Sequence, residues 1–328
     1  QIKQESLTDN AVRNPLYYLD KTFNNAGFFL QDNLRFNQFD VVFGARIDRH
    51  SELNNPVISP RLNIKYDLNQ EMALRAGVST GFKAPQIYNE DLHICGLEGG
   101  QRVIRNASNL KEEKSVTGNL SFDYLGYISD MATMINLTAY YTYLDNAFTL
   151  VDIPDTEPLI NIWERQNGEG ARVKGVEADF GFRPNNKTEL RSSLTYKTAQ
   201  YDHIQNSEFE NATDDFLQTP NLSGNIRLNY KILDELEVNF AAKYIGKMKI
   251  LHESAEKIKS TPNFFVLDIG FKSDRNIISG VDNNIKIGIK NITDAYQNDL
   301  DRGAGRDPSY VYGPLLPRVY YFDFSISL

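Results

Sequence analysis

Hydrophobic and polar residues alternate along most of this chain, and the pattern is clearest at its C-terminal end. Tyr320, Phe322, Phe324, Ile326 and Leu328 are separated by single residues that are mostly polar or amphipathic. Successive side chains of a β-strand point to opposite faces of a sheet. The pattern therefore predicts a strand that turns one apolar face to lipid or a protein core and its polar face to water.

The same alternation recurs without an intervening helical pattern and predicts about thirteen strands. We expect them near residues 20–36, 38–49, 57–67, 70–82, 112–125, 130–148, 170–183, 187–201, 217–231, 235–247, 262–273, 283–293 and 317–328. The predicted fold class is all-β.

The connections between these strands alternate in length. Segments such as 67–70 and 184–186 are short and rich in Asn and Asp, whereas segments such as 83–111 and 293–317 are long. Short periplasmic turns opposite long extracellular loops are typical of outer-membrane barrels. A soluble sandwich gives no reason for long loops at one end only, and no repeat of fixed period indicates a propeller. The favoured architecture is an antiparallel transmembrane β-barrel.

Composition agrees with a barrel and excludes several other classes. Charged residues make up 24% of the chain, and no apolar run reaches the roughly 18 to 20 residues that a membrane helix needs. Barrel strands need only alternate residues to be apolar, and 18 Tyr and 19 Phe suit strands and interfacial girdles. A net charge of -8 gives no reason to expect nucleic acid as a partner. The single cysteine, Cys95, excludes an internal disulfide and is too few for a zinc or iron–sulfur site.

The beginning of the chain lacks both alternation and the features of a signal peptide. We expect residues 1–19 to be the tail of an outer loop and residues 20–328 to form the barrel wall. Complete bacterial barrels usually have an even number of strands. An odd count therefore predicts that the chain is the C-terminal portion of a larger barrel.

Three stretches resemble the TonB-dependent outer-membrane receptors. Residues 80–93 include Gly-Phe-Lys-Ala-Pro at 81–85 and are similar to the family's GFRAP box, in the extended form found in Bacteroidetes. Residues 106–115 resemble the family's NPNLKPE segment. Residues 291–296, followed by 313–318 and the terminal aromatic strand, resemble its C-terminus. The three stretches stand in the family's order across most of the predicted strands.

The resemblance implies the last part of a barrel of about 22 strands, a size associated with plugged transporters. Neither the family's plug domain nor its TonB-contacting box is in this sequence. Lys83 replaces the common Arg of the first box, Ala107 stands where Pro is usual, and Leu328 stands where Phe is frequent. These departures leave any assignment finer than the family open.

The resemblance also implies a function in the outer membrane of a Gram-negative cell. The expected activity is TonB-dependent uptake of a scarce metal-bearing small molecule, namely an iron siderophore, haem or cobalamin. One implied partner is the TonB–ExbB–ExbD complex, which would act through the N-terminal region that is missing here. The other implied partners are the metal chelate, lipid, lipopolysaccharide and a surface lipoprotein, as in some Bacteroidetes. No resident cofactor is expected.

Ligand capture requires a concave mouth lined by a few polar and aromatic groups. The outer loops, of which 83–111 is the longest, supply the candidate residues. They are Tyr88, Asp91, His93, Arg102, Arg105, Trp163, Arg302 and Tyr310.

Two of these candidates suggest specific chemistry. Haem receptors of the family carry a histidine between the first two boxes, and imidazole is a usual ligand of haem iron, so His93 is a candidate iron ligand. The alternative is that Asp91 and His93 only fix the loop by hydrogen bonds. Arg102 and Arg105 can bind carboxylates or catecholates through planar bidentate contacts, or be solvated loop charges.

A second group of polar residues is expected to point into the barrel, where it would meet a plug or water. It comprises Arg46, Arg61, Lys65, Arg75, Glu177, Asp179, Arg227, Lys243, Asp268 and Lys286.

Two other function classes stay open. A passive porin would have similar strands without the family's boxes. A barrel enzyme would need a nucleophile and a base, or paired acids with a histidine, at the rim. No such constellation is visible in the sequence, so we expect no catalytic residue and no metal site built by the protein.

Overall fold

The computed structural model describes residues 1–9, 18–88, 94–95, 101–153, 160–205, 207, 209–274, 282–303, 306–307 and 309–327. Most of these residues form one antiparallel sheet of 15 strands, and the 3-10 helix η3 spans Glu253–Ala255. No helix in the described part of the chain is long and apolar enough to cross a membrane.

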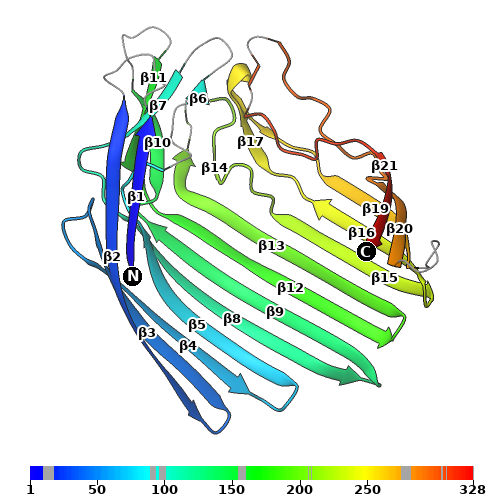
Figure 1. Cartoon of the computed structure of the whole chain (residues 1–328). Helices are drawn as coiled ribbons and strands as arrows, with labels where there is room; N and C mark the ends of the chain where they lie inside the picture. Colours follow the sequence, from blue (N-terminus) through cyan, green and yellow to red (C-terminus); the bar gives the residue numbers. More distant parts are fainter. Residues whose placement is uncertain are drawn as a thin grey trace.

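The strands of the main sheet follow one another in space in the order of the sequence. In that order they are β1 (Ile2–Asp9), β2 (Leu19–Phe36), β3 (Phe39–His50), β4 (Val57–Asp67), β5 (Met72–Lys83), β8 (Glu113–Ile128), β9 (Met131–Asp145), β12 (Ala171–Asn185), β13 (Thr188–Gln205), β15 (Leu222–Leu233), β16 (Leu236–Ile245), β19 (Phe264–Ser273), β20 (Asp282–Lys290) and β21 (Val319–Ser327), while β14 (Thr213–Asp215) pairs with β13. Figure 1 shows the sheet as a curved wall, with short turns at one end and longer connections at the other.

Each of the predicted strands is present, with ends that differ by a few residues. Within the expected outer loops the structure adds two small sheets. One contains β10 (Phe148–Ile153), β11 (Ile160–Asn167), β7 (Gln101–Asn106) and β6 (Ile94–Cys95), and the other contains β17 (Lys249–His252) and β18 (Lys257–Ser260).

Part of residues 1–19, the segment expected to be the tail of an outer loop, forms a strand. Ile2 to Asp9 form β1, which pairs antiparallel with β2 from Ile2 opposite Ala26 to Asp9 opposite Leu19. Both faces of β1 carry polar side chains, so its sequence shows no alternation, and the backbone ladder holds it instead. The main path of the sheet therefore holds one strand more than the thirteen predicted, and its strand count is even.

The register of the sheet separates an apolar face from a polar one. Leu120 pairs with Ala139, which pairs with Val176, and Leu120 and Val176 are both exposed. One position along, Asn119 pairs with Tyr140, which pairs with Gly175 on the other face. A continuous apolar face open to the surroundings is the arrangement that lipid requires of barrel strands.

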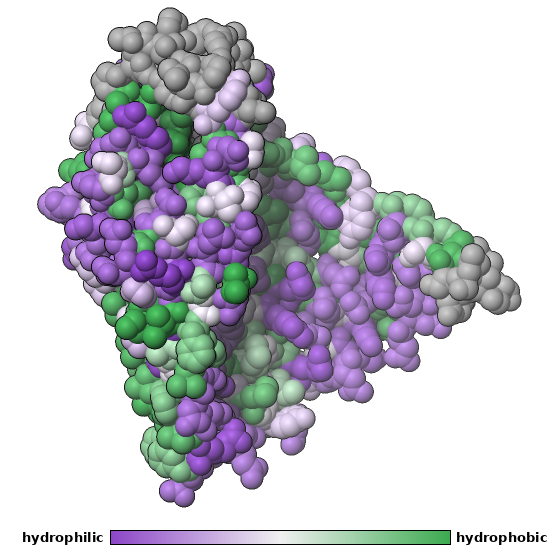
Figure 2. All heavy atoms as spheres, turned by 60° about the vertical axis from the view of Figure 1, so that its left-hand side comes forward, coloured by the Kyte–Doolittle hydropathy of each residue, from purple (hydrophilic) through white to green (hydrophobic). Residues whose placement is uncertain are grey.

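The other face of the wall is hollowed and largely hydrophilic. Figure 2 shows hydrophilic side chains gathered around the hollow in the middle of the molecule. The pairing registers of β3, β4, β5, β12, β15, β16, β19 and β20 place the polar residues expected to point inward on this same face. We refer to it below as the inner face.

Candidate functional site

A short segment after β5 folds back across the inner face at the end where the long connections lie. This segment, residues 84–88, is called the strap below. Ile87 is buried in a cluster with Leu7 of β1 and Phe23 of β2. The strap begins at Ala84-Pro85, where proline cannot donate a ladder hydrogen bond and disfavours helix in the residue before it.

His50 on β3 fixes the middle of the strap. Its Nδ1 accepts a hydrogen bond from the backbone N–H of Glu52 at 3.2 Å, so the ring proton lies on Nε2. Nε2 is 2.9 Å from Oε1 of Gln86 and donates to it. Both His50 and Gln86 are buried. The strap is thus held by β1, β2 and β3, although it follows β5 in the chain.

Two cations and two aromatic rings meet at the end of the strap, in what we call the cation–aromatic cluster. The Nζ of Lys83 lies 4.3 Å from the ring centroid of Tyr88 and 5.9 Å from that of Phe148. The guanidinium carbon of Arg165 lies 5.3 Å and 5.7 Å from the same two centroids. These distances are within the range of cation–π attraction.

Arg165 and Asn106 connect this cluster to the second motif of the sequence. Asn106 donates from Nδ2 to the carbonyl oxygen of Pro85 at 2.8 Å. Arg165 donates from Nη1 to the carbonyl oxygen of Gln86 at 3.1 Å and lies 3.4 Å from Oδ1 of Asn106. The box at 81–85 and the segment that starts at residue 106 are therefore in contact, as the sequence alone did not indicate.

A cavity of about 240 Å³ opens beside the strap. Its lining brings together lysines, a histidine and aromatic rings from four strands and the strap. The lining residues are Lys3, Glu5, Phe23, Asn25, His50, Phe82, Lys83, Ala84, Gln86 and Tyr88. Lys3 pairs with Glu5 at 3.1 Å, and Lys83 leaves the lining with a net positive charge. Such a lining suits a small anionic or aromatic group, because the positive charge attracts an anion and the rings offer stacking surfaces.

A second cluster joins the β17–β18 hairpin to the long connection before β21. The rings of His252 and Tyr310 are stacked, with centroids 3.9 Å apart. Oδ2 of Asp301 lies 2.8 Å from Nε2 of His252 and accepts a hydrogen bond from Ser254 Oγ at 2.6 Å. Hydrogen bonds from Ser254, from His252 and from the backbone N–H of Asp307 lower the pKa of Asp301 to about 2. We call this arrangement the carboxylate latch.

Tyr310 and Tyr312 both donate their hydroxyl protons to Asp299. The oxygen–oxygen distances are 3.0 Å and 2.6 Å respectively. Burial and the neighbouring carboxylate raise the pKa of Tyr310 to about 12 and also raise the pKa of Tyr312. Tyr310 is only 2% exposed, which indicates that it holds this loop together in the conformation described.

The grouping of Ser254, His252 and Asp301 was not expected from the sequence, since 47 residues separate Ser254 from Asp301. Their geometry differs from that of a hydrolase relay, in which the nucleophile hydroxyl and the carboxylate contact opposite nitrogens of the imidazole. Here both Ser254 and Asp301 contact Nε2, and Nδ1 is buried without a hydrogen-bond partner among the described residues. The arrangement is suited to fixing a loop.

The remaining candidates are dispersed. Arg105 donates to Oε2 of Glu164 at 3.2 Å and is about half exposed. Trp163 lies on β11 two residues before Arg165, and Arg302 is exposed near the latch. Arg102 lies on β7 by its backbone, whereas Asp91 and His93 lie outside the described residues. Of the candidates whose side chains the structure describes, Tyr88 alone lies in the cation–aromatic cluster.

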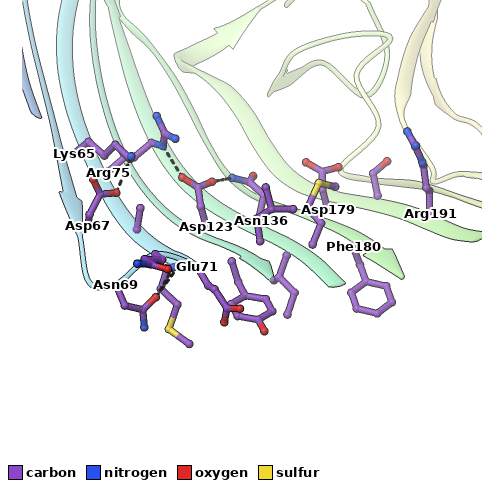
Figure 3. A pocket seen from close by; sticks show the side chains of 18 of the residues that line it. Lys65, Asp67, Asn69, Glu71, Arg75, Asp123, Asn136, Asp179, Phe180 and Arg191 are labelled. Atoms are coloured by element: carbon purple, nitrogen blue, oxygen red, sulfur yellow. Dashed lines mark hydrogen bonds and ion pairs between the residues drawn. The ribbon is translucent and has the colours of Figure 1, made fainter. Parts of the chain in front are cut away.

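At the end with the short turns, the inner face holds a larger pocket of about 670 Å³. Figure 3 shows charged side chains of β4, β5, β8, β12 and β13 along it. Asp123 accepts from Arg75 Nε at 2.5 Å and from Asn136 Nδ2 at 2.6 Å. Arg75 and Asp123 are thus paired across neighbouring strands, and Lys65 pairs with Asp67 on its own strand, so this part of the wall is a hydrogen-bonded polar surface.

Comparison with known proteins places these features in a family. A family model described as TonB dependent receptor-like, β-barrel matches residues 3–292. The iron-regulated outer membrane virulence protein of Vibrio cholerae is 29% identical over 229 residues, which cover 68% of this chain and 34% of that protein. The probable TonB-dependent siderophore receptor PirA of Acinetobacter baumannii is 24% identical over 256 residues, which cover 72% of this chain and 33% of that protein.

Solved structures share the fold. The ferric enterobactin receptor PfeA of Pseudomonas aeruginosa superposes with a TM-score of 0.69 at 18% identity, covering 98% of this chain and 49% of that one. The siderophore receptor PirA of the same organism gives a TM-score of 0.69 at 17% identity, and the superposition covers 100% of this chain and 52% of that one. The chain therefore spans about a third of the length of the curated relatives and about half of the solved chains.

Proposed function

Because this chain belongs to the TonB-dependent receptor-like β-barrel family, we propose that it takes up an iron siderophore across the outer membrane at the expense of energy delivered by TonB. The names of the relatives support this choice among siderophore, haem and cobalamin: one is a probable siderophore receptor and another a ferric enterobactin receptor. A siderophore receptor needs to bind and release its cargo and breaks no bond of it.

The observation that carries the proposal is the cation–aromatic cluster beside the cavity. Ferric siderophores are commonly anionic and built from oxygen donors, many of them on aromatic rings. Lys83 is exposed, and the rings of Tyr88 and Phe148 lie next to it. A cation backed by aromatic surfaces at the end with the long connections suits the first contact with such a chelate.

The partners stay proposals as well. Interaction with TonB–ExbB–ExbD would involve parts of a receptor outside this chain. A surface lipoprotein over the loops, lipopolysaccharide around the apolar face and the assignment to a Bacteroidetes form all remain predictions from the sequence.

The test is uptake by cells that carry the complete gene. We expect cells with the receptor to accumulate ⁵⁵Fe from ferric enterobactin or another ferric siderophore, and a tonB deletion to abolish the uptake. Haem and cyanocobalamin serve as the comparison cargoes. Uptake that persists at the same rate without TonB would indicate a passive channel and contradict the proposal.

A further inference from the structure

Arg165 brings together three segments that are distant in the sequence. It lies on β11, contacts the strap through Gln86 and Tyr88, and contacts Phe148 at the start of β10. Its partner Asn106 ends β7. Arg165 is only 6% exposed, whereas Arg105 and Arg172 are each more than half exposed at their side chains. A buried arginine at a junction of loops requires an explanation.

Stability alone is a poor explanation. Removing a guanidinium from water costs several kcal/mol, and an apolar side chain of similar size often fills such a site at least as well. What arginine adds is a rigid, planar fork of donors that fixes the direction of its acceptors. Here Nη1 donates to the carbonyl oxygen of Gln86 in the strap and to Oδ1 of Asn106, and the guanidinium lies over the rings of Tyr88 and Phe148. The side chain is therefore suited to setting the position of the strap.

The strap in turn sets the position of the exposed cation. Lys83 contacts the same two rings as Arg165, those of Tyr88 and Phe148. The hydroxyl of Tyr88 donates to the carbonyl oxygen of Ala84, which folds this ring back onto its own strap. If the strap moves, the surface on which Lys83 rests moves with it.

We propose that Arg165 is a positioning residue for ligand capture: it fixes the strap so that Lys83 and Tyr88 face the cavity in a geometry ready for an anionic aromatic chelate. The effect of Arg165 on ligand binding rests on the proposed function, whereas its effect on the position of the strap does not. The two are therefore measured separately.

The experiment uses the complete receptor with Arg165→Met, which keeps the volume and removes the donors, and Arg165→Lys, which keeps the charge with a single nitrogen. The control is Arg172→Met, because Arg172 is paired with Asp202 on the apolar face, away from the cavity. Hydrogen exchange followed by mass spectrometry is read on peptides covering residues 82–88 and on peptides from β19, β20 and β21.

We expect Arg165→Met to speed exchange in residues 82–88 about tenfold and to leave β19, β20 and β21 unchanged. Arg165→Lys should be intermediate, and Arg172→Met should match the wild type in both regions. Unchanged exchange in the strap would overturn the proposal. Faster exchange throughout the barrel would also overturn it, because the side chain would then serve general stability.

Equilibrium binding of ferric enterobactin to the purified receptors tests capture. We expect Arg165→Met to weaken binding about tenfold and Arg172→Met to leave it unchanged. A loosened strap with unchanged binding would refute the role in capture. A wild-type receptor that binds no ferric siderophore would refute the proposed function, and the exchange data would still decide whether Arg165 positions the strap.

Discussion

Tyr321 of β21 is paired with Gly288 of β20, and its phenol oxygen occupies the space where a side chain on Gly288 would lie. A Cβ built on Gly288 would be 2.7 Å from this oxygen, and one built on Gly270 of β19 would be closer still. The ring therefore crosses three strands on the inner face. Both glycines are required by this close approach, and at Gly288 a Cβ would also lie against the backbone carbonyl oxygen of Ile269.

We expect Gly288→Ala to lower the free energy of unfolding by about 1–3 kcal/mol, because the methyl group forces Tyr321 or the backbone to move. The matched control is Gly118→Ala, since a Cβ there would have its nearest neighbour 4.0 Å away. Unfolding titrations in liposomes give both values. Equal costs for the two substitutions would show that Tyr321 does not lie across Gly288.

The faces of β20 give a second prediction. Ile287 pairs with Phe322 and is 47% exposed on the apolar face, while Lys286 pairs with Asp323 on the inner face. Ile287→Arg should lower the free energy of unfolding by about 2–4 kcal/mol if the residue lies near the bilayer midplane, because a charge would face hydrocarbon. Lys286→Ser should lower the free energy of unfolding far less. The reverse order in liposome unfolding would mean that the register is wrong by one residue.

Acid should open the carboxylate latch. The pKa of Asp301 is lower in the folded protein than its ordinary value of 3.8 and lies at about 2. A depressed carboxyl pKa stabilises the fold above the ordinary pKa, and this contribution is lost as the pH falls through the folded value. We therefore expect cleavage of the connection between β20 and β21 by pepsin to accelerate between about pH 4 and pH 2.

The control for this experiment is Asp301→Asn, which cannot titrate at this position. Cleavage of the variant should already be fast at pH 4 and should depend less on pH than cleavage of the wild type. Each cleavage rate is first divided by the rate at which pepsin cleaves an unfolded substrate at the same pH. If the cleavage rates of the wild type and the variant depend on pH in the same way, Asp301 does not hold the loop.

Deletion of residues 94–105 tests the longest outer loop. The deletion removes β6 and all but one residue of β7, so β11 loses its parallel partner beside the cation–aromatic cluster. We expect weaker equilibrium binding of the ferric siderophore with unchanged abundance of the receptor at the cell surface. Unchanged affinity would exclude this loop from the binding site.

His93→Ala separates two cargo classes. A haem carrier that loses an axial ligand should lose affinity for haem and show an altered Soret band, whereas a siderophore carrier should change little. Because we propose a siderophore, we expect ferric siderophore binding to stay within about twofold. A wild-type receptor that binds haem and loses its Soret signal in His93→Ala would contradict that choice.

The sequence determined where the strands are and which way their side chains point. Within the strands from β2 onward, apolar residues recur at every second position. This period is a property of the extended backbone itself, so the sequence shows it before any strand has a partner. Strand β1 shows the limit of this reasoning. Its side chains are polar on both faces, and only pairing with β2 makes it a strand.

The site was decided by the tertiary structure. His50 meets Gln86 across 36 residues, and Arg165 meets the same residue across 79. His252 and Asp301 meet across 49. Local periodicity describes neighbours within a strand or turn and carries no information at such separations. Sequence reasoning could place Tyr88 in an outer loop, but only the curvature of the sheet and the fold of the strap bring Arg165, Phe148 and Lys83 to its ring.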